Sequence, residues 1–415
     1  MEQALDKNQI LKLSIVFALI YFFSINGLAS LPGITISFLL KDVLKMTATQ
    51  AAYFGAVTLV GWAIKPIWGL ISDLIPIFGY RRKSYLIITA TITTIVWVYL
   101  GQVENFSIKT LLILFTLSST MYAFMDVICD GLMVETGKPY NITGQLQSIQ
   151  WTSVYIAAII TGLVGGWVAK NLAPQTVFLI TGMFPVLILL SSLFIKETKV
   201  INHAEHLKLT VVSLKKASRT KTIWLLALFL FLWTFSPSFG APFFYYAVDV
   251  LKFDQIFLGI VATVGAASSA VGAILYARYV KKIKTRVWIN VAIFLGVIAT
   301  LFDLIYFTQL VQQNLALAKA LNIATAAILS VIGSITFLMI LNAAALACPK
   351  NGEGTTFATL TSFWNIGLIG SSILGGFLFE KIGLQPLIIT SAVFTAAAWI
   401  VLPHLQFADD DMPVA

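Results

Sequence analysis

The chain has 415 residues, of which 59% are hydrophobic and 11% charged, and its mean hydropathy is +0.90. Soluble domains carry roughly a quarter charged residues, so this composition excludes a water-soluble fold. The formal net charge is +9. Lys and Arg stand in short loops between apolar stretches, without the basic and aromatic stripe of a nucleic-acid binder, so we expect no nucleic-acid partner.

Apolar stretches recur along the chain from Leu11 to Leu405. A helix of about 20 apolar residues spans a bilayer, so the stretches predict an all-α integral membrane protein with twelve transmembrane helices. The predicted ranges are 11–40, 50–74, 84–101, 109–134, 146–170, 175–195, 222–248, 253–278, 287–308, 318–347, 355–379 and 386–405. Twelve spans place both termini on one side, and most Lys and Arg fall on that side. We therefore expect cytoplasmic termini and a multi-pass protein of the cell inner membrane.

A basic loop after the sixth span divides the chain in two. We expect a six-helix half over residues 1–195, a cytoplasmic central loop over 196–221 and a second six-helix half over 222–415. Stretches beginning at Gly144 and Gly354 each reach a Gly-Gly pair at the same offset, which indicates a repeat. Parallel repeats are typical of transporters that rock two halves around a central site. Chance is the alternative, because small residues are common wherever membrane helices pack closely.

The loop after the second span reads GLISDLIPIFGYRRK and runs from Gly69 to Lys83. An Asp at a helix end followed by Gly and a basic cluster resembles the signature loop of the major facilitator superfamily. We expect Asp73 to contact a basic group of a neighbouring helix end or loop when the cytoplasmic side is closed, and to release it on opening. Alternatively, the basic residues only set topology. The residues of this gating motif are Gly69, Asp73, Gly79, Arg81 and Arg82.

Three charged residues, Lys65, Asp126 and Asp130, fall inside predicted spans. A charge at the membrane centre costs about 2.5–3.5 kcal/mol, so such residues usually face a cavity or a partner. The two Asp residues are four positions apart and share a helical face, and neighbouring carboxylates favour sharing a proton. We expect them to couple transport to protons, and Lys65 to bind a fourth-helix carboxylate or an anionic substrate. The alternative for the two Asp residues is a structural role at a hydrated helix end. The alternative for Lys65 is a side chain that extends to the membrane surface.

The seventh span contains Pro237, Gly240 and Pro242, which prevent a regular helix. Membranes tolerate a broken helix where it lines a cavity or is buried in protein. We expect this segment to face the substrate path, with Pro237 beside it and Tyr245 among the aromatic residues that stack on a flat ring. The alternative for the aromatic residues is an interfacial belt.

The fifth span opens with Gln147, Gln150 and Trp151, and the eleventh opens with a similar polar series. Polar side chains at corresponding positions of both halves predict one cytoplasmic-facing cavity, with these three residues in contact with substrate. Hydrogen bonding between helices is an equally physical explanation.

Several runs resemble the folate-biopterin transporter family of the major facilitator superfamily. They are YFFSINGLASLPGITISFLLKDVLKMTATQAA, KPIWGLISDLIPIFGYRRKSYL and DVICDGLMVE followed by GQLQSIQW. The resemblance implies two six-helix bundles and proton-driven uptake of folates or pterins. The residues that match the family's motifs are Lys65, Gly69, Asp73, Pro76, Gly79, Tyr80, Arg81, Arg82, Asp126 and Asp130.

These observations predict a secondary active transporter, with proton-coupled uptake of folate or a related pterin. Its expected partners are a small solute, the proton and the lipid bilayer; we expect a monomer that is not an enzyme and has no cofactor or metal. One alternative is a carrier for another metabolite, such as S-adenosylmethionine or a muropeptide. The other is a membrane receptor that does not transport. Charged residues inside spans argue against it, because they are costly and a purely structural protein does not need them.

Overall fold

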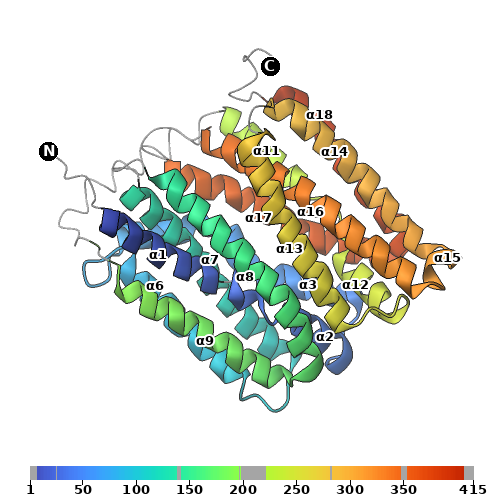
Figure 1. Cartoon of the computed structure of the whole chain (residues 1–415), viewed down its shortest axis with the longest axis horizontal. Helices are drawn as coiled ribbons and strands as arrows, with labels where there is room; N and C mark the ends of the chain where they lie inside the picture. The colour runs from blue at the N-terminus through green and yellow to red at the C-terminus, as the bar shows by residue number, and fades with distance from the viewer. Residues whose placement is uncertain are drawn as a thin grey trace.

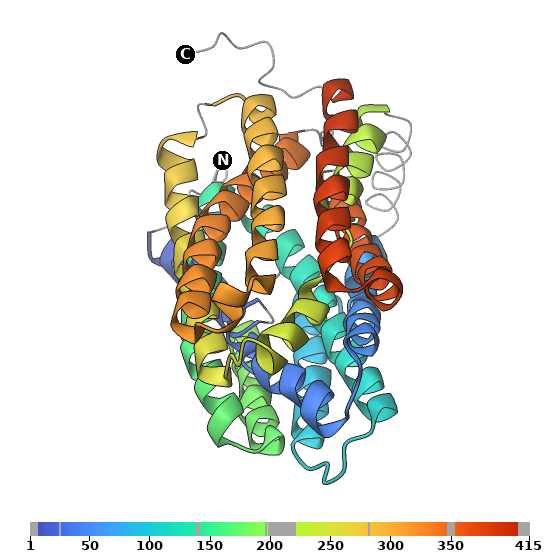
Figure 2. The ribbon, with the colours of Figure 1, turned by 90° about the vertical axis from the view of Figure 1, so that its right-hand side faces the viewer.

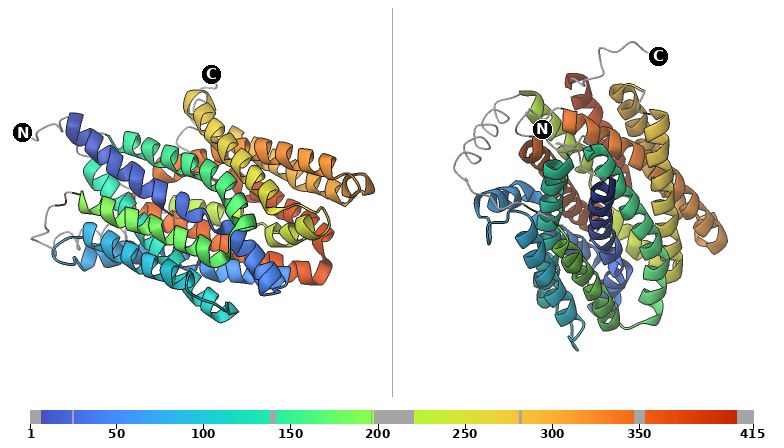
Figure 3. Two further views of the ribbon diagram at one scale, coloured as in Figure 1. Left: turned by 60° about the horizontal axis from the view of Figure 1, so that its bottom comes forward. Right: turned by 60° about the vertical axis from the view of Figure 1, so that its left-hand side comes forward.

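The structure is a computed structural model that describes residues 7–24, 26–137, 142–195, 197, 221–280, 283–346 and 353–405. Over these ranges the chain is almost wholly helical, and the blue-to-green part lies beside the yellow-to-red part (Figure 1). Figure 2 shows the long helices running side by side along one direction. The same two groups of helices are visible in the left view of Figure 3. The predicted central loop lies outside the described residues, apart from Glu197 and Lys221.

The first group of helices follows the predicted spans in order. Its elements are α1 (Lys7–Phe23), η1 (Leu28–Ser30), α2 (Gly33–Phe38), η2 (Leu39–Val43), α3 (Ala48–Thr58), α4 (Val60–Ala63), α5 (Lys65–Leu74), α6 (Lys83–Leu100), α7 (Ile108–Gly137), α8 (Thr143–Asn171) and α9 (Pro174–Leu193). The second group comprises α11 (Lys221–Thr234), α12 (Gly240–Asp249), α13 (Gln255–Arg278), α14 (Thr285–Phe302), η5 (Asp303–Phe307), α15 (Gln309–Gln312), α16 (Leu315–Leu346), α17 (Glu353–Ile382), α18 (Leu384–Val401) and η6 (Leu402–His404).

Ten helical segments of the described chain are long and apolar enough to cross a membrane. The two other predicted spans are present as consecutive shorter helices, α3 to α5 and α11 with α12. The structure is therefore an all-α membrane protein consistent with twelve spans. We call the end of the bundle where α1 begins and α18 ends the terminal side, and the opposite end the far side.

Each group of helices builds its own apolar core. One buried cluster joins α1, α6, α7, α8 and α9, and includes Phe17, Leu86 and Ile128. Another joins α11, α14, α16, α17 and α18, and includes Phe229 and Ile293. The two clusters share no residue, and the groups meet along α8 with α13 and along α3 with α17.

The first predicted helix is not continuous, so the prediction of one helix over 11–40 is wrong. The α-helix ends at Phe23, and the next α-helical turn begins at Gly33. At Gly27 an added Cβ would lie 2.2 Å from the carbonyl oxygen of Phe22, so only glycine allows the chain to turn back this closely. The predicted second helix also divides, because Ile64 leaves helical geometry and Pro66 occupies the first turn of α5.

The expected break in the seventh span is confirmed between α11 and α12. Its backbone is held by neighbouring helices of the same group. The amide of Ser238 donates to the carbonyl of Ser371 at 3.0 Å, and the hydroxyl of Ser236 donates to the carbonyl of Ser391 at 2.8 Å. The first bond satisfies a backbone amide that a regular helix would satisfy internally, and the second fixes the break against α18, which makes the break compatible with a membrane.

Candidate functional site

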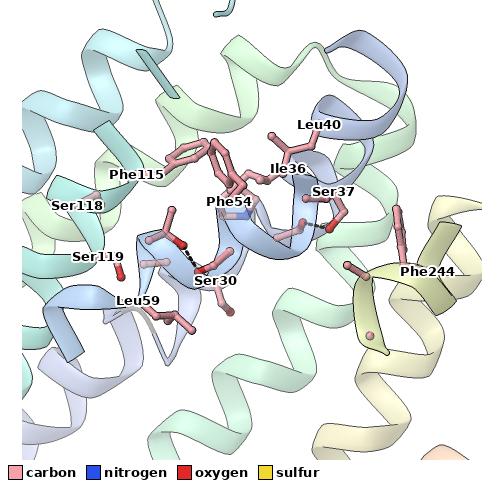
Figure 4. Close-up of a pocket in the computed structure, with 18 of the residues that line it drawn as sticks. Ser30, Ile36, Ser37, Leu40, Phe54, Leu59, Phe115, Ser118, Ser119 and Phe244 are labelled. Atoms are coloured by element: carbon pink, nitrogen blue, oxygen red, sulfur yellow. Dashed lines mark hydrogen bonds between the residues drawn. The ribbon is translucent and has the colours of Figure 1, made fainter. Parts of the chain in front are cut away.

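A cavity of about 760 Å³ lies between α2, α3, α7 and α12, so both groups of helices contribute to its wall. Serines and aromatic rings from these elements surround it (Figure 4). The side chains that line it, all uncharged among the described residues, include Asn26, Ser30, Ser37, Phe54, Thr58, Trp62, Trp97, Phe115, Ser118, Ser119, Phe244, Tyr245 and Asn365. Pockets of about 300–1,000 Å³ hold small organic ligands, so the size suits a metabolite.

The wall of the cavity combines flat apolar faces with hydrogen-bonding groups. Phe54 and Phe115 lie edge to face with ring centroids 6.1 Å apart, and Trp97 packs against Phe115 at 5.7 Å. The hydroxyl of Ser118 is buried and makes no hydrogen bond to any described residue. The cavity therefore suits a flat ring that carries hydrogen-bonding atoms.

A buried ion pair lies directly behind one wall of the cavity. Lys65 Nζ is 2.7 Å from Asp126 Oδ2, and the two side chains are 10% and 13% exposed. The same ammonium lies 4.7 Å from the ring centroid of Trp62, whose Nε1 donates to the Ser119 hydroxyl at 3.1 Å. Lys65 thus has the expected fourth-helix partner and does not extend to the membrane surface. Trp62 separates the solute space from the charges.

Asp130 lies one turn beyond Asp126 on α7 and accepts a hydrogen bond from the Tyr21 hydroxyl at 3.1 Å. A narrow crevice lined by Tyr21, Asn26, Asp126 and Cys129 lies beside this contact. Asn26 also lines the large cavity, so it belongs to both spaces. The carboxylates are therefore next to the solute space, although neither lines it.

The predicted gating motif forms a compact charge cluster on the terminal side. The guanidinium of Arg82 is 2.7 Å from Asp73 and 2.7 Å from Glu135 at the end of α7, while Arg81 lies 3.4 Å from Glu135. Burial alone would lower the pKa of Arg82, but the carboxylates of Glu135 and Asp73 outweigh burial and raise it. An added Cβ at Gly131 would lie 2.9 Å from the Arg82 Cζ, so this guanidinium packs directly on α7. Asp73 does contact a basic residue at a helix end.

Both motif glycines serve local geometry. Gly79 has φ +84°, in the left-handed region that glycine tolerates best, and it turns the chain before Arg81. Gly69 faces α7, where an added Cβ would lie 3.6 Å from Val127 Cγ1. The first glycine shapes the loop and the second packs α5 against α7.

Glu197 is a functional candidate that sequence reasoning missed. Its carboxylate accepts hydrogen bonds from the backbone amides of Arg81, Arg82 and Lys83, at distances between 2.8 and 3.2 Å. These amides open α6, where unpaired donors favour an anion. The sequence shows Glu197 as an acidic residue at the start of a basic loop. It does not show that Glu197 contacts Arg81, which is more than a hundred positions away. Glu197 thus connects the segment that follows α9 to the gating motif.

The remaining predicted residues lie outside the wall of the cavity, with one exception. Gln147 is exposed, Gln150 is buried, and Trp151 packs edge to face on Phe337 with ring centroids 5.2 Å apart. Pro237 stands in the break between α11 and α12, and only Tyr245 lines the cavity. Contact of the fifth-span residues with substrate stays a prediction.

Comparison with known proteins fits this arrangement. Residues 26–405 match the model of the BT1 family. A folate-biopterin transporter of Synechocystis sp. is 31% identical over 377 residues, which cover 89% of this chain and 75% of that protein. A putative folate transporter 2 of Plasmodium berghei is 25% identical, over 92% of this chain and 86% of that protein.

Solved transporters share the fold at low sequence identity. A D-xylose-proton symporter superposes with a TM-score of 0.70 and 13% identity, covering 96% of this chain and 98% of that chain. A nucleoside transporter superposes with a TM-score of 0.67 and 13% identity, over 95% and 97% of the two chains. These chains are major facilitator transporters. The chain thus belongs to the BT1 family of folate-biopterin transporters, and it is a membrane transporter with the major facilitator fold rather than an enzyme.

Proposed function

We propose that the protein takes up folate or a related pterin together with protons. The observation that carries the proposal is the position of Trp62, which lines the uncharged cavity and also lies against the Lys65 ammonium of the buried ion pair. A pterin is a flat ring edged with hydrogen-bonding atoms, which matches aromatic and hydroxyl walls. The names of the relatives supply the same substrate class.

Proton coupling in this proposal depends on Asp126. Protonation of Asp126 would remove the charge that holds Lys65 at 2.7 Å. A released Lys65 would leave the face of Trp62, and the wall of the cavity would change shape. Proton binding and solute binding would then be linked through one tryptophan, which is what a symporter requires. Asp130 and Tyr21 extend the proton-carrying group towards the first helix.

The proposal includes an orientation in the membrane. The terminal side carries Arg81, Arg82 and Lys83, so we assign it to the cytoplasm of a cell inner membrane. Residues 1–195 and 222–415 would be the two rocking halves. A periplasmic reporter fused after Ala415 should be inactive and a cytoplasmic one active, and the reverse would reject this orientation.

Uptake by the purified protein in liposomes tests the function. Radiolabelled folic acid and biopterin are supplied with and without an inward proton gradient. We expect accumulation of at least one compound that depends on the gradient and is lost in Asp126→Asn. Exchange of solute that continues in that variant without accumulation would show that the carboxylate couples rather than binds.

Failure has two distinguishable forms. Unchanged accumulation by Asp126→Asn would remove the coupling role of this residue. No uptake of either compound by correctly inserted protein would reject the substrate class, and another metabolite would become the candidate.

A further inference from the structure

An anionic solute needs a cation that the cavity wall does not supply. Folic acid carries two carboxylates on its glutamate tail, whereas biopterin is uncharged at neutral pH. Among the described residues no charged side chain lines the cavity. The cations beside its wall are Lys65, behind Trp62, and Lys41, next to Leu40 and Tyr245 of the wall.

Lys65 is paired with Asp126 in this structure. The two side chains of this ion pair are only 10% and 13% exposed. While Asp126 is ionised, separating the pair would leave an uncompensated carboxylate in a dry site, which is the most costly way to break a salt bridge. A solute carboxylate would also have to pass Trp62. Lys65 is therefore poorly placed to receive it.

Lys41 lies beside the cavity, towards the far side of the bundle, where the two groups of helices meet. Its Nζ is 2.6 Å from Asp249 Oδ1 of α12 and 3.2 Å from Asp42 Oδ1. The same ammonium lies 5.6 Å from the ring centroid of Tyr245, whose hydroxyl donates to the carbonyl of Met46 at 2.7 Å. These contacts hold α12 against η2 and the residues that follow it, beside the cavity.

Of the two carboxylates beside Lys41, that of Asp249 can leave at little cost. The side chain of Asp249 is 57% exposed, so its carboxylate returns to water rather than to a dry interior when the pair opens. Lys252 is also close, because its Nζ donates to the backbone carbonyl of Asp249 at 2.5 Å. The freed carboxylate thus has a second cation at hand. Lys41 itself is only 12% exposed and stays beside the wall.

We propose that Lys41 accepts the carboxylate of an anionic solute in place of Asp249, and that this exchange sets the preference for anionic over neutral pterins. The inference rests on the proposed function and names a specificity residue within it. Binding of the anion would also remove the bridge between η2 and α12. Solute recognition and opening of the far side would thus use the same ammonium.

Two variants separate the cation from the bridge. Lys41→Gln removes both, whereas Asp249→Asn removes the bridge and keeps the ammonium. Lys170→Gln is the matched control, because Lys170 pairs with Asp254 at 3.3 Å on the same side of the membrane and also joins the two groups. The KM values for folic acid and biopterin are measured for each variant in liposomes.

We expect Lys41→Gln to raise the KM for folic acid about tenfold, the effect of one lost charge-assisted hydrogen bond, and to leave biopterin unchanged. Asp249→Asn should keep or lower the KM for folic acid, and Lys170→Gln should leave both solutes unchanged. Equal changes for both solutes in Lys41→Gln, or none, would overturn the assignment. So would loss of folic acid uptake in Asp249→Asn.

The wild-type protein distinguishes this inference from the proposed function. Uptake of biopterin without folic acid would keep the function and overturn the role of Lys41. Uptake of neither compound would overturn both. If Lys41→Gln fails to insert, Asp249→Asn decides, since its folic acid uptake must survive.

Discussion

The side chains of Lys65 and Asp126 are each other's charge partner and almost entirely withdrawn from water. Removing one partner of such a pair costs about 3–5 kcal/mol, because the other charge is left unpaired. We expect Asp126→Asn to lower the thermal unfolding temperature in detergent clearly, and the double variant with Lys65→Gln to recover part of the loss. Lys170→Ala, in a pair that is 46% and 44% exposed, serves as the control and should change little. A double variant no more stable than Asp126→Asn would argue against a mutual pair.

Glu197 gives a second prediction about a single residue. Its carboxylate receives three backbone amides at the start of α6, so Glu197→Ala should destabilise the protein by about 1 kcal/mol, as loss of a helix cap does. Glu197→Gln keeps an acceptor and should lose less. Thermal unfolding measures the difference, and the exposed Glu104→Gln is the control. Identical stability of all three variants would show that the contact is not a cap.

Individual site residues could be predicted from the sequence where a charged side chain falls inside an apolar span. Lys65 and Asp126 stand out because charges inside apolar spans are costly, and the structure pairs them. Tyr21 and Asn26 could not be found this way, since an uncharged tyrosine or asparagine in a membrane helix has many bland explanations. Their importance comes from helices that meet only in the folded chain.

Among the helices, α8 and α13 approach each other through glycines. An added Cβ at Gly166 would lie 2.6 Å from the Gln255 carbonyl oxygen and 3.0 Å from the Gly259 Cα. Gly166→Ala should push the helices apart, destabilise the protein by about 1–3 kcal/mol and reduce transport. Gly333→Ala is the control, because nothing lies within 4 Å of its added Cβ. Equal behaviour of the two variants would mean that the close approach is not required.

The repeated Gly-Gly pairs have equivalent surroundings in the two groups. Gly166 lies against α13, and Gly376 lies against α3, where the Thr49 hydroxyl donates to its carbonyl at 3.1 Å. In both pairs the second glycine thus faces the other group. This gives the sequence repeat a physical reason, since small residues let helices of different groups pack closely.

Hydropathy predicted where helices run but not where they break. The seventh span was recognised as broken because Pro237 and Gly240 are strong signals within a few residues. The break in the first span contains Gly27 and ends at Pro32, the N-cap of α2, but membrane helices tolerate an isolated glycine or proline. An apolar run looks the same whether the backbone inside it is regular or turned.

At the scale of the whole molecule, two ion pairs between described residues join the groups on the far side: Lys170 with Asp254, and Lys41 with Asp249. If the groups rock, a fixed link at one of them should stop transport. We expect Lys170→Cys with Asp254→Cys, joined by a short thiol cross-linker, to lose uptake and to regain it when a cleavable linker is reduced. Radiolabelled solute uptake measures both states.

The control for this link joins two positions of one group. Gln175 Nε2 donates to the Val103 carbonyl at 3.2 Å, and both residues belong to the first group. Val103→Cys with Gln175→Cys should cross-link without loss of uptake. Full activity of the cross-linked far-side pair would show that the groups do not separate there.

The uncharged wall of the cavity has an electrical consequence. The side chains that line it bring no charge to offset that of the solute. Moving one elementary charge across a potential of about 100 mV changes its free energy by about 2.3 kcal/mol. With one proton per solute, a neutral pterin would cross as a net cation and be drawn into a cell that is negative inside. A folate dianion with the same single proton would cross as a net anion, so the membrane voltage would favour one substrate and oppose the other.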